Sequence, residues 1–133
     1  MSVLVLGLSH RTASLDLLER VALETPRAAK LRQAVLDSPH VTEAVVMSTC
    51  NRVEIYAAVE RFHASIEDIT AIFSDVTGLD AETWLPCVYV LYDEGAVAHL
   101  FDVATGLDSM VIGEAQVIGQ VKDALRSHGL PVR

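Results

Sequence analysis

The stretch "VVMSTCNRVEIY", Val45–Tyr56, predicts a β-hairpin, and the rest of the fold can be built outward from it. Two runs of apolar and β-branched residues, 43–49 and 53–60, flank a short polar turn, which is the pattern of two antiparallel strands. A tight hairpin usually turns through Asn-Gly or Asp-Gly. This turn instead carries Cys50 and Arg52, a soft nucleophile beside a fixed positive charge. The hairpin is therefore both the centre of the predicted sheet and a candidate site.

Alternating elements are expected on both sides of the hairpin. Periodicity and turn residues predict a strand at 3–9, helices at 14–23 and 25–37, a helix at 65–78, a strand at 86–93, a helix at 94–106, a loop at 106–113 and a last helix at 114–127. The helix ends carry the usual signals, with Ser14 and Thr25 as N-caps, Pro26 at a first helical position, and Gly78 and Gly106 after the last turn.

The order β-α-α-β-β-α-β-α-α indicates an α+β fold of the split βαβ type. We expect a small antiparallel sheet with helices on one face, together with a helical C-terminal lobe. The 133 residues suit one domain, 1–133, with a single modest core. Because the last helix has little sequence after it to pack against, we expect this chain to be one domain of a longer protein.

Composition excludes several classes of protein. With 51% hydrophobic residues the chain is globular, and no apolar run approaches the roughly 18 residues of a membrane span. The N-terminus has no basic leader, so it is interpreted as a first strand and not as a signal peptide. Two cysteines without an export signal favour a reducing cytoplasm over a disulfide framework. No Cys/His spacing resembles a closed zinc site, so no metal is expected.

The net charge of −8 argues against general nucleic-acid binding, which depends on many contacts between basic side chains and phosphates. It leaves room for a few contacts to one nucleotide end. A full nucleic-acid footprint would then have to lie outside this chain.

Cys50 has two interpretations. Free cysteines are commonly small buried packing residues, and Cys87, inside an apolar strand, fits that description. At a polar turn, however, Arg52 and backbone N–H groups can stabilise a thiolate at Cys50, the form needed for covalent catalysis. Arg52 is either a solvated charge or a bidentate clamp for a carboxylate. Asn51 suits a turn position with positive φ, which by itself explains its presence.

Two further sets of residues could carry chemistry. His99, in an apolar helix, is either a histidine at the edge of the core or an acid or base near Cys50. The loop and helix start after it hold four polar residues that could bind a small polar ligand: Ser109, Glu114, Gln116 and Gln120. The alternative is an ordinary helix N-terminus with a favourably placed glutamate.

Three motifs resemble the N-terminal catalytic domain of glutamyl-tRNA reductase. They are "GLSHRTASL" at 7–15, "STCNRVEIY" at 48–56 and "HLFDVATGLDSMVIGEAQVIGQVKDA" at 99–124. The resemblance spans nearly the whole chain with the motifs in the family's order. It implies the reduction of glutamyl-tRNA with NADPH to glutamate-1-semialdehyde, the first step of tetrapyrrole (porphyrin and haem) biosynthesis from glutamate.

The resemblance also implies roles for single residues. Cys50 is the nucleophile that forms a thioester, and His99 is a second catalytic residue. The glutamate site comprises Thr49, Asn51, Arg52, Ser109, Glu114, Ala115, Gln116 and Gln120. The chain departs from the family at Ala115, where proline is usual, and at Val53, where threonine is frequent.

For the whole enzyme, the resemblance implies an NADPH-binding domain and a dimerisation domain, neither of which this chain contains. It further implies a homodimer and channelling of the product to glutamate-1-semialdehyde aminomutase. On this basis the chain alone is expected to acylate and hydrolyse but not to reduce.

Two alternatives of other kinds stay open at this stage. One is a non-catalytic split βαβ module that binds an amino acid or an RNA end. Aromatic residues make up only 5% of the chain, which disfavours a sheet that stacks RNA bases. The other is a stand-alone cysteine hydrolase, which needs a Cys-His-Asn/Asp set and has His99 as its one candidate partner.

Overall fold

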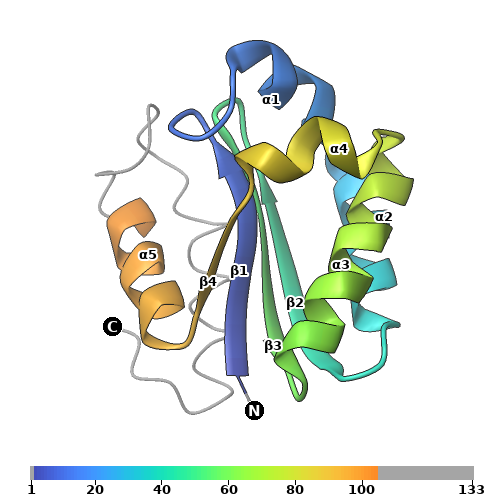
Figure 1. Cartoon of the computed structure of the whole chain (residues 1–133), viewed down its shortest axis with the longest axis vertical. Coiled ribbons are helices and arrows are strands. Elements are labelled where there is room, and N and C mark those ends of the chain that lie inside the picture. Colours follow the sequence, from blue (N-terminus) through green and yellow to red (C-terminus); the bar gives the residue numbers. More distant parts are fainter. Residues whose placement is uncertain (1, 105–133) are drawn as a thin grey trace.

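The computed structural model describes residues 2–104, which form a four-stranded antiparallel sheet with helices packed against it (Figure 1). The strands are β1 (Ser2–Ser9), β2 (Val41–Ser48), β3 (Arg52–Val59) and β4 (Tyr89–Tyr92). Their order across the sheet is β2-β3-β1-β4, and each neighbouring pair is antiparallel. Because β3 lies between β1 and β2, this is the predicted split βαβ arrangement.

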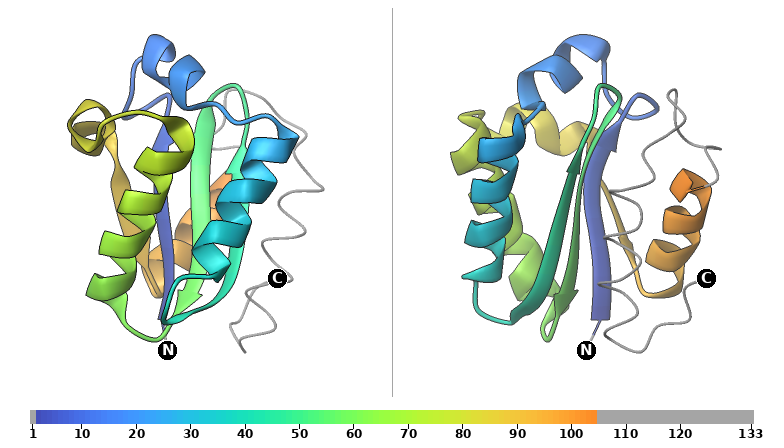
Figure 2. Two further views of the ribbon diagram at one scale, coloured as in Figure 1. Left: turned by 90° about the vertical axis from the view of Figure 1, so that its right-hand side faces the viewer. Right: turned by 180° about the vertical axis from the view of Figure 1, so that it is seen from behind.

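Helices cover both faces of the sheet. The helical segments are α1 (Leu15–Val21), α2 (Thr25–Leu36), α3 (Phe62–Thr77), α4 (Ala81–Trp84), the 3-10 turn η1 (Leu85–Cys87) and α5 (Glu94–Ala104). Figure 2 shows α2 and α3 on one side and α5 on the other. The expectation of helices on one face therefore holds only for α2 and α3. Every residue of β3 is buried, as is nearly all of β1, so both faces need a cover.

Two apolar clusters correspond to the two faces. The larger packs Leu31 and Val35 of α2 and Ile69 and Phe73 of α3 against the sheet. The smaller packs part of α5 against the opposite side, through Val3, Val5, Met47, Tyr56, Ala96, Leu100 and Val103. The second cluster has fewer members, and it shares its face with the polar residues described below.

Most of the predicted boundaries agree with the structure. Ser14 caps α1 by accepting a hydrogen bond from Leu17 N, and Gly78 ends α3 with a left-handed φ of 74°. Thr25 is not an N-cap, because it already lies in α2 and Glu24 takes the cap position. The strand predicted at 86–93 begins later, since Pro86 lies within η1.

The loop predicted at 106–113, the helix predicted at 114–127 and Gly106 lie outside the described residues. Among residues 2–104, no helix combines the length and the apolar character that crossing a bilayer requires.

Candidate functional site

The tip of the β2–β3 hairpin presents Cys50 to solvent on a loop that is itself well fixed. Ser48 pairs with Val53, which leaves the loop between β2 and β3 to Thr49, Cys50 and Asn51. Thr49 N donates to the Arg52 carbonyl at 2.8 Å, and Thr49 Oγ1 donates to Asn51 Oδ1 at 2.8 Å. Asn51 is buried, whereas Cys50 is exposed. This exposure rules out the interpretation of Cys50 as a buried packing residue.

Asn51 does not have the positive φ that its residue type suggested. Among the described non-glycine residues only His40 and Asp93 have positive φ. Asn51 instead ties two loops together, because its carbonyl accepts a hydrogen bond of 2.9 Å from His10 N in the β1–α1 loop. That loop is in turn closed by a bond from Ser9 N to Thr12 Oγ1. The nucleophile candidate therefore lies on a loop that is braced from a second segment.

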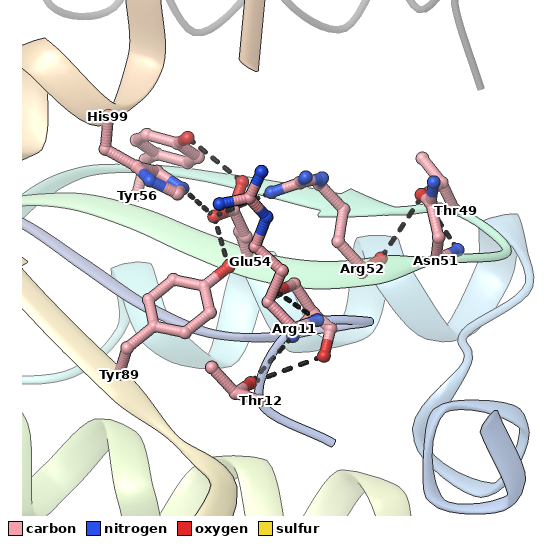
Figure 3. Close-up of polar contacts among 10 residues, drawn as sticks. Arg11, Thr12, Thr49, Asn51, Arg52, Glu54, Tyr56, Tyr89 and His99 are labelled. Atoms are coloured by element: carbon pink, nitrogen blue, oxygen red, sulfur yellow. Dashed lines mark hydrogen bonds and ion pairs between the residues drawn. The ribbon is translucent and has the colours of Figure 1, made fainter. Parts of the chain in front are cut away.

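Four side chains converge on the carboxylate of Glu54 (Figure 3). Tyr56 Oη donates to Oε1 at 3.0 Å, and Tyr89 Oη donates to Oε2 at 2.5 Å. His99 Nε2, from α5, also contacts Oε2, and Arg52 Nη1 lies 3.5 Å from the same oxygen. Because a carboxylate only accepts, Nε2 is the ring nitrogen of His99 that carries a proton in this contact. We call these five residues the Glu54 cluster.

Strand alternation places the cluster on the α5 face. Successive side chains of a strand point to opposite faces, so Arg52, Glu54 and Tyr56 share one face of β3, and Val53 and Ile55 share the other. Across the sheet, Gly7 of β1 pairs with Glu54 on one side and with Tyr89 on the other. Glu54 of β3 and Tyr89 of β4 therefore meet over Gly7 of β1, which has no side chain to separate them.

The pair Arg52–Glu54 is entirely removed from solvent, with both side chains 0% exposed. Burial of two charges costs free energy that only good compensation from neighbouring groups offsets. The donors of Tyr56, Tyr89 and His99 supply such compensation to Glu54. This buried group of charged and hydrogen-bonded side chains is therefore a candidate binding or catalytic site.

A cavity of about 370 Å³ adjoins the cluster. Among the described residues it is lined by Ser9, Arg11, Thr12, Tyr89, Leu91, His99 and Asp102. In Figure 3 the Arg11 side chain extends from the β1–α1 loop toward Glu54. Tyr89 and His99 belong both to the cavity wall and to the Glu54 cluster, so a ligand in the cavity would lie against the cluster.

Comparisons with known proteins identify the family. The model of the glutamyl-tRNA(Glu) reductase N-terminal domain matches residues 6–129. Glutamyl-tRNA reductase 1 of a Nocardioides species is 53% identical over 127 residues, which are 96% of this chain and 30% of that protein. Glutamyl-tRNA reductase of Thermobifida fusca is 52% identical over 126 residues, 95% of this chain and 26% of that one. This chain belongs to the N-terminal domain family of glutamyl-tRNA reductases.

A solved structure supports the same conclusion. Glutamyl-tRNA reductase from Methanopyrus kandleri superposes with a TM-score of 0.61 and 31% sequence identity, over 93% of this chain and 27% of that chain. The chain thus spans between 22 and 30% of the length of the curated reductases that it matches. It corresponds to their N-terminal domain.

The family's motif residues can now be located. Arg52 and His99 meet through Glu54, and Thr49 and Asn51 form the hairpin tip beside Cys50. The other predicted residues lie outside the described part of the chain: Ser109, Glu114, Ala115, Gln116 and Gln120. The prediction that Arg52 supports a thiolate at Cys50 stays a prediction. Within residues 2–104, no group of three or more His, Cys, Asp or Glu side chains could hold a metal ion.

Sequence reasoning missed Gly7, Glu54, Tyr56 and Tyr89. A signal for two of them exists, because polar Arg52, Glu54 and Tyr56 alternate with apolar residues along a strand that is otherwise buried. Tyr89 gave no such signal, since its partner Glu54 is 35 residues away in the sequence.

Replacing Gly7 with alanine is expected to disturb the cluster. A Cβ at Gly7 would lie 2.9 Å from Glu54 Cγ and 2.9 Å from Tyr89 Oη, closer than real Cβ contacts allow. Overpacking of this kind costs about 1–3 kcal/mol. We expect the Gly7→Ala chain to lose that amount in the free energy of unfolding, measured in urea by the fluorescence of Trp84, the single tryptophan, which is fully buried.

Gly95 provides the matched control for this substitution. A Cβ there meets nothing within 4 Å, and Gly95 lies in α5, where alanine is the better helix former by up to about 1 kcal/mol. Gly95→Ala should therefore leave stability unchanged or raise it. An equally stable Gly7→Ala chain would contradict the described packing beneath Glu54.

Tyr56 should make the fold sensitive to alkali. Burial, followed by the charge of Glu54, raises the pKa of Tyr56 well above 10. In the unfolded chain the phenol ionises near pH 10, whereas in the folded chain it holds its proton, so the folded state binds more protons above that pH. The contribution of Tyr56 to the free energy of unfolding is therefore fully present below pH 10, and above pH 10 it falls by about 1.4 kcal/mol per pH unit. Urea unfolding measured between pH 8 and pH 11 tests this, and Tyr56→Phe should flatten the decline.

Proposed function

We propose that this chain is the acyl-accepting domain of a cytoplasmic glutamyl-tRNA reductase. The observation that carries the proposal is an exposed thiol on a loop that leads directly into a strand beginning with a buried cation. Cys50 lies at the tip of the hairpin, and Arg52, two residues later, is fully buried with its Nη1 3.5 Å from Glu54 Oε2. The family to which the chain belongs supplies the substrate, glutamyl-tRNA.

Arg52 is proposed to bind the γ-carboxylate of the glutamyl group. A guanidinium recognises a carboxylate through two parallel N–H donors, and this pairing is stronger away from water. Glu54, itself held by Tyr56, Tyr89 and His99, places a negative charge 3.5 Å from the guanidinium, which favours keeping Arg52 buried at this position. The remaining glutamate contacts are proposed to come from Thr49, Asn51, Ser109, Glu114, Ala115, Gln116 and Gln120.

Cys50 is the proposed nucleophile. Its thiolate attacks the glutamyl carbonyl carbon, a C–S bond forms, and the ester C–O bond to the 3′-terminal ribose breaks. The ribose oxygen takes up a proton from an acid group of the site or from water and leaves as a hydroxyl group, and the glutamyl group stays on Cys50 as a thioester. The exposure of Cys50 provides the access that a bulky aminoacyl-tRNA end requires.

His99 is proposed to act first as a positioning residue. Its Nε2 faces Glu54, so the imidazole helps to fix the carboxylate that holds Arg52. A proton given by His99 to the leaving ribose oxygen would have to come from Nδ1. This refines the role of proton donor that the sequence suggested for His99.

NADPH, when bound by the longer enzyme, supplies the hydride that reduces the thioester to the aldehyde. The proposed full-length protein is a homodimer that passes glutamate-1-semialdehyde to its aminomutase. For the present chain we propose acylation at Cys50 and slow hydrolysis of the thioester, without reduction.

The test is incubation of the chain with glutamyl-tRNA, followed by peptide mass mapping at mildly acidic pH. We expect a glutamyl adduct on the peptide with Cys50 and none on the peptide with Cys87. Added NADPH should yield no aldehyde. An adduct on both cysteines, or on neither, would contradict the proposed function and favour a non-catalytic binding module. Alkylation alone does not separate these cases, because Cys50 is exposed and Cys87 partly buried.

A further inference from the structure

We propose that Tyr89 is a positioning residue that sets the affinity of the site for the glutamyl carboxylate, by keeping Glu54 from pairing too closely with Arg52. The proposal rests on the function proposed above and concerns the same site. It assigns a role to a residue of β4, a strand far in sequence from the Cys50 hairpin.

The two oxygens of Glu54 have different partners. Oε1 accepts from Tyr56, whereas Oε2 is shared by Tyr89, His99 and Arg52. The Tyr89 bond at 2.5 Å is much shorter than the Arg52 separation of 3.5 Å. A close charged pair has its N and O atoms about 2.7–2.9 Å apart, so the Arg52 contact is a loose one. Tyr89 and His99 thus share the oxygen that Arg52 would otherwise approach, and Tyr89 supplies the donor from the β4 side.

Contacts with neighbouring residues of the sheet and of α5 fix the position of the Tyr89 side chain beside Glu54. Its hydroxyl lies directly over Gly7, where a Cβ would come within 2.9 Å of it. Its ring lies against the His99 ring, with centroids 5.3 Å apart. Tyr89 is half-buried and lines the cavity beside the cluster, so it also borders the space that a ligand would occupy.

Loss of the hydroxyl should tighten the internal ion pair. Without Tyr89 Oη, Oε2 of Glu54 loses one of its two close donors and keeps only His99, so it can shift toward Arg52 and form a direct, charge-assisted bond with it. The guanidinium would then be drawn toward Glu54 and would offer less to an incoming carboxylate. The rate at which esters without a carboxylate acylate Cys50 should not change, because Cys50 lies on a loop that has its own hydrogen bonds.

The experiment compares Tyr89→Phe with the unaltered chain in two measurements. The first is the concentration of L-glutamate that half-protects Cys50 from iodoacetamide, which needs no acyl transfer. The second is acylation of Cys50 by glutamyl-tRNA and, separately, by p-nitrophenyl acetate, a neutral ester. We expect Tyr89→Phe to raise the half-protecting concentration and the KM for glutamyl-tRNA roughly tenfold. The rate with the neutral ester should stay within about twofold.

Two other tyrosines serve as comparisons. Tyr92→Phe makes the same change on the same strand, but Tyr92 is 60% exposed and packs against Phe62 instead of the cluster. It should change none of the three quantities. Tyr56→Phe removes a bond to the other oxygen of Glu54 and should lower stability more than it changes glutamate protection.

The outcomes separate the two proposals. Equal losses with both esters, or no change in glutamate protection, would overturn the role of Tyr89, as would the absence of any protection in the unaltered chain. If glutamate protection weakens as expected but glutamyl-tRNA acylates neither cysteine, the role of Tyr89 stands and the proposed function fails.

Discussion

Replacing Cys50 with alanine is expected to lower the rate of glutamyl transfer from glutamyl-tRNA to the chain by at least roughly a thousandfold. The substitution removes the sulfur atom that is proposed to form the covalent bond, so no other contact is expected to compensate for it. Stability should change by less than about 0.5 kcal/mol, because Cys50 is exposed at the hairpin tip. The measurement is the initial rate of release of deacylated tRNA, together with the unfolding free energy from urea titration.

Cys50→Ser distinguishes a nucleophile from a mere contact residue. The hydroxyl keeps the size of the side chain but is far less nucleophilic at neutral pH, so the loss should be nearly as large as with alanine. Cys87→Ala is the control, since Cys87 packs against the larger core and should not affect transfer. Full activity of Cys50→Ser would show that Cys50 does not attack the ester.

Replacing Glu54 with glutamine should have the largest effect on stability. Glu54→Gln keeps the shape but removes the charge that faces the buried Arg52, and breaking a buried pair from one side costs about 3–5 kcal/mol. Glu60→Gln, at an exposed position just after β3, should cost less than about 0.5 kcal/mol. Urea unfolding followed by Trp84 fluorescence measures both.

A double-mutant cycle shows whether the loss of stability in Glu54→Gln comes from the interaction of Glu54 with Arg52. In an Arg52→Met background there is no buried cation to leave uncompensated, so Glu54→Gln should cost less than half as much there. A coupling free energy of 1 kcal/mol or more between the two positions is expected for contacting charges. Strictly additive effects would mean that Arg52 and Glu54 do not depend on each other for stability.

Local patterns were sufficient for most of the fold. The runs on either side of "STCNR" predicted the hairpin of β2 and β3, and the order of elements predicted a split βαβ fold with an antiparallel sheet. Ser14 and Gly78 marked helix ends correctly because capping depends on neighbours within one turn. The predicted N-cap at Thr25 was wrong by one residue, since Glu24 takes that position, and the predicted start of β4 was wrong by three, since residues 85–87 form the 3-10 turn η1.

By itself the sequence determined the α+β class, the hairpin, and Cys50, Arg52 and His99 as residues of interest, because each rests on local periodicity or on a short motif. Only the tertiary structure shows that Arg52 is buried against Glu54 and that His99 Nε2 contacts the same carboxylate. It also shows that Tyr89, from β4, donates a hydrogen bond to that carboxylate. It also placed α5 on the second face of the sheet. The contacts of Glu54 with Tyr89 depend on the register in which β3 and β4 pair with the two edges of β1. Gly7 provides the space for that meeting because it has no side chain, and its role appears only when all three strands are paired.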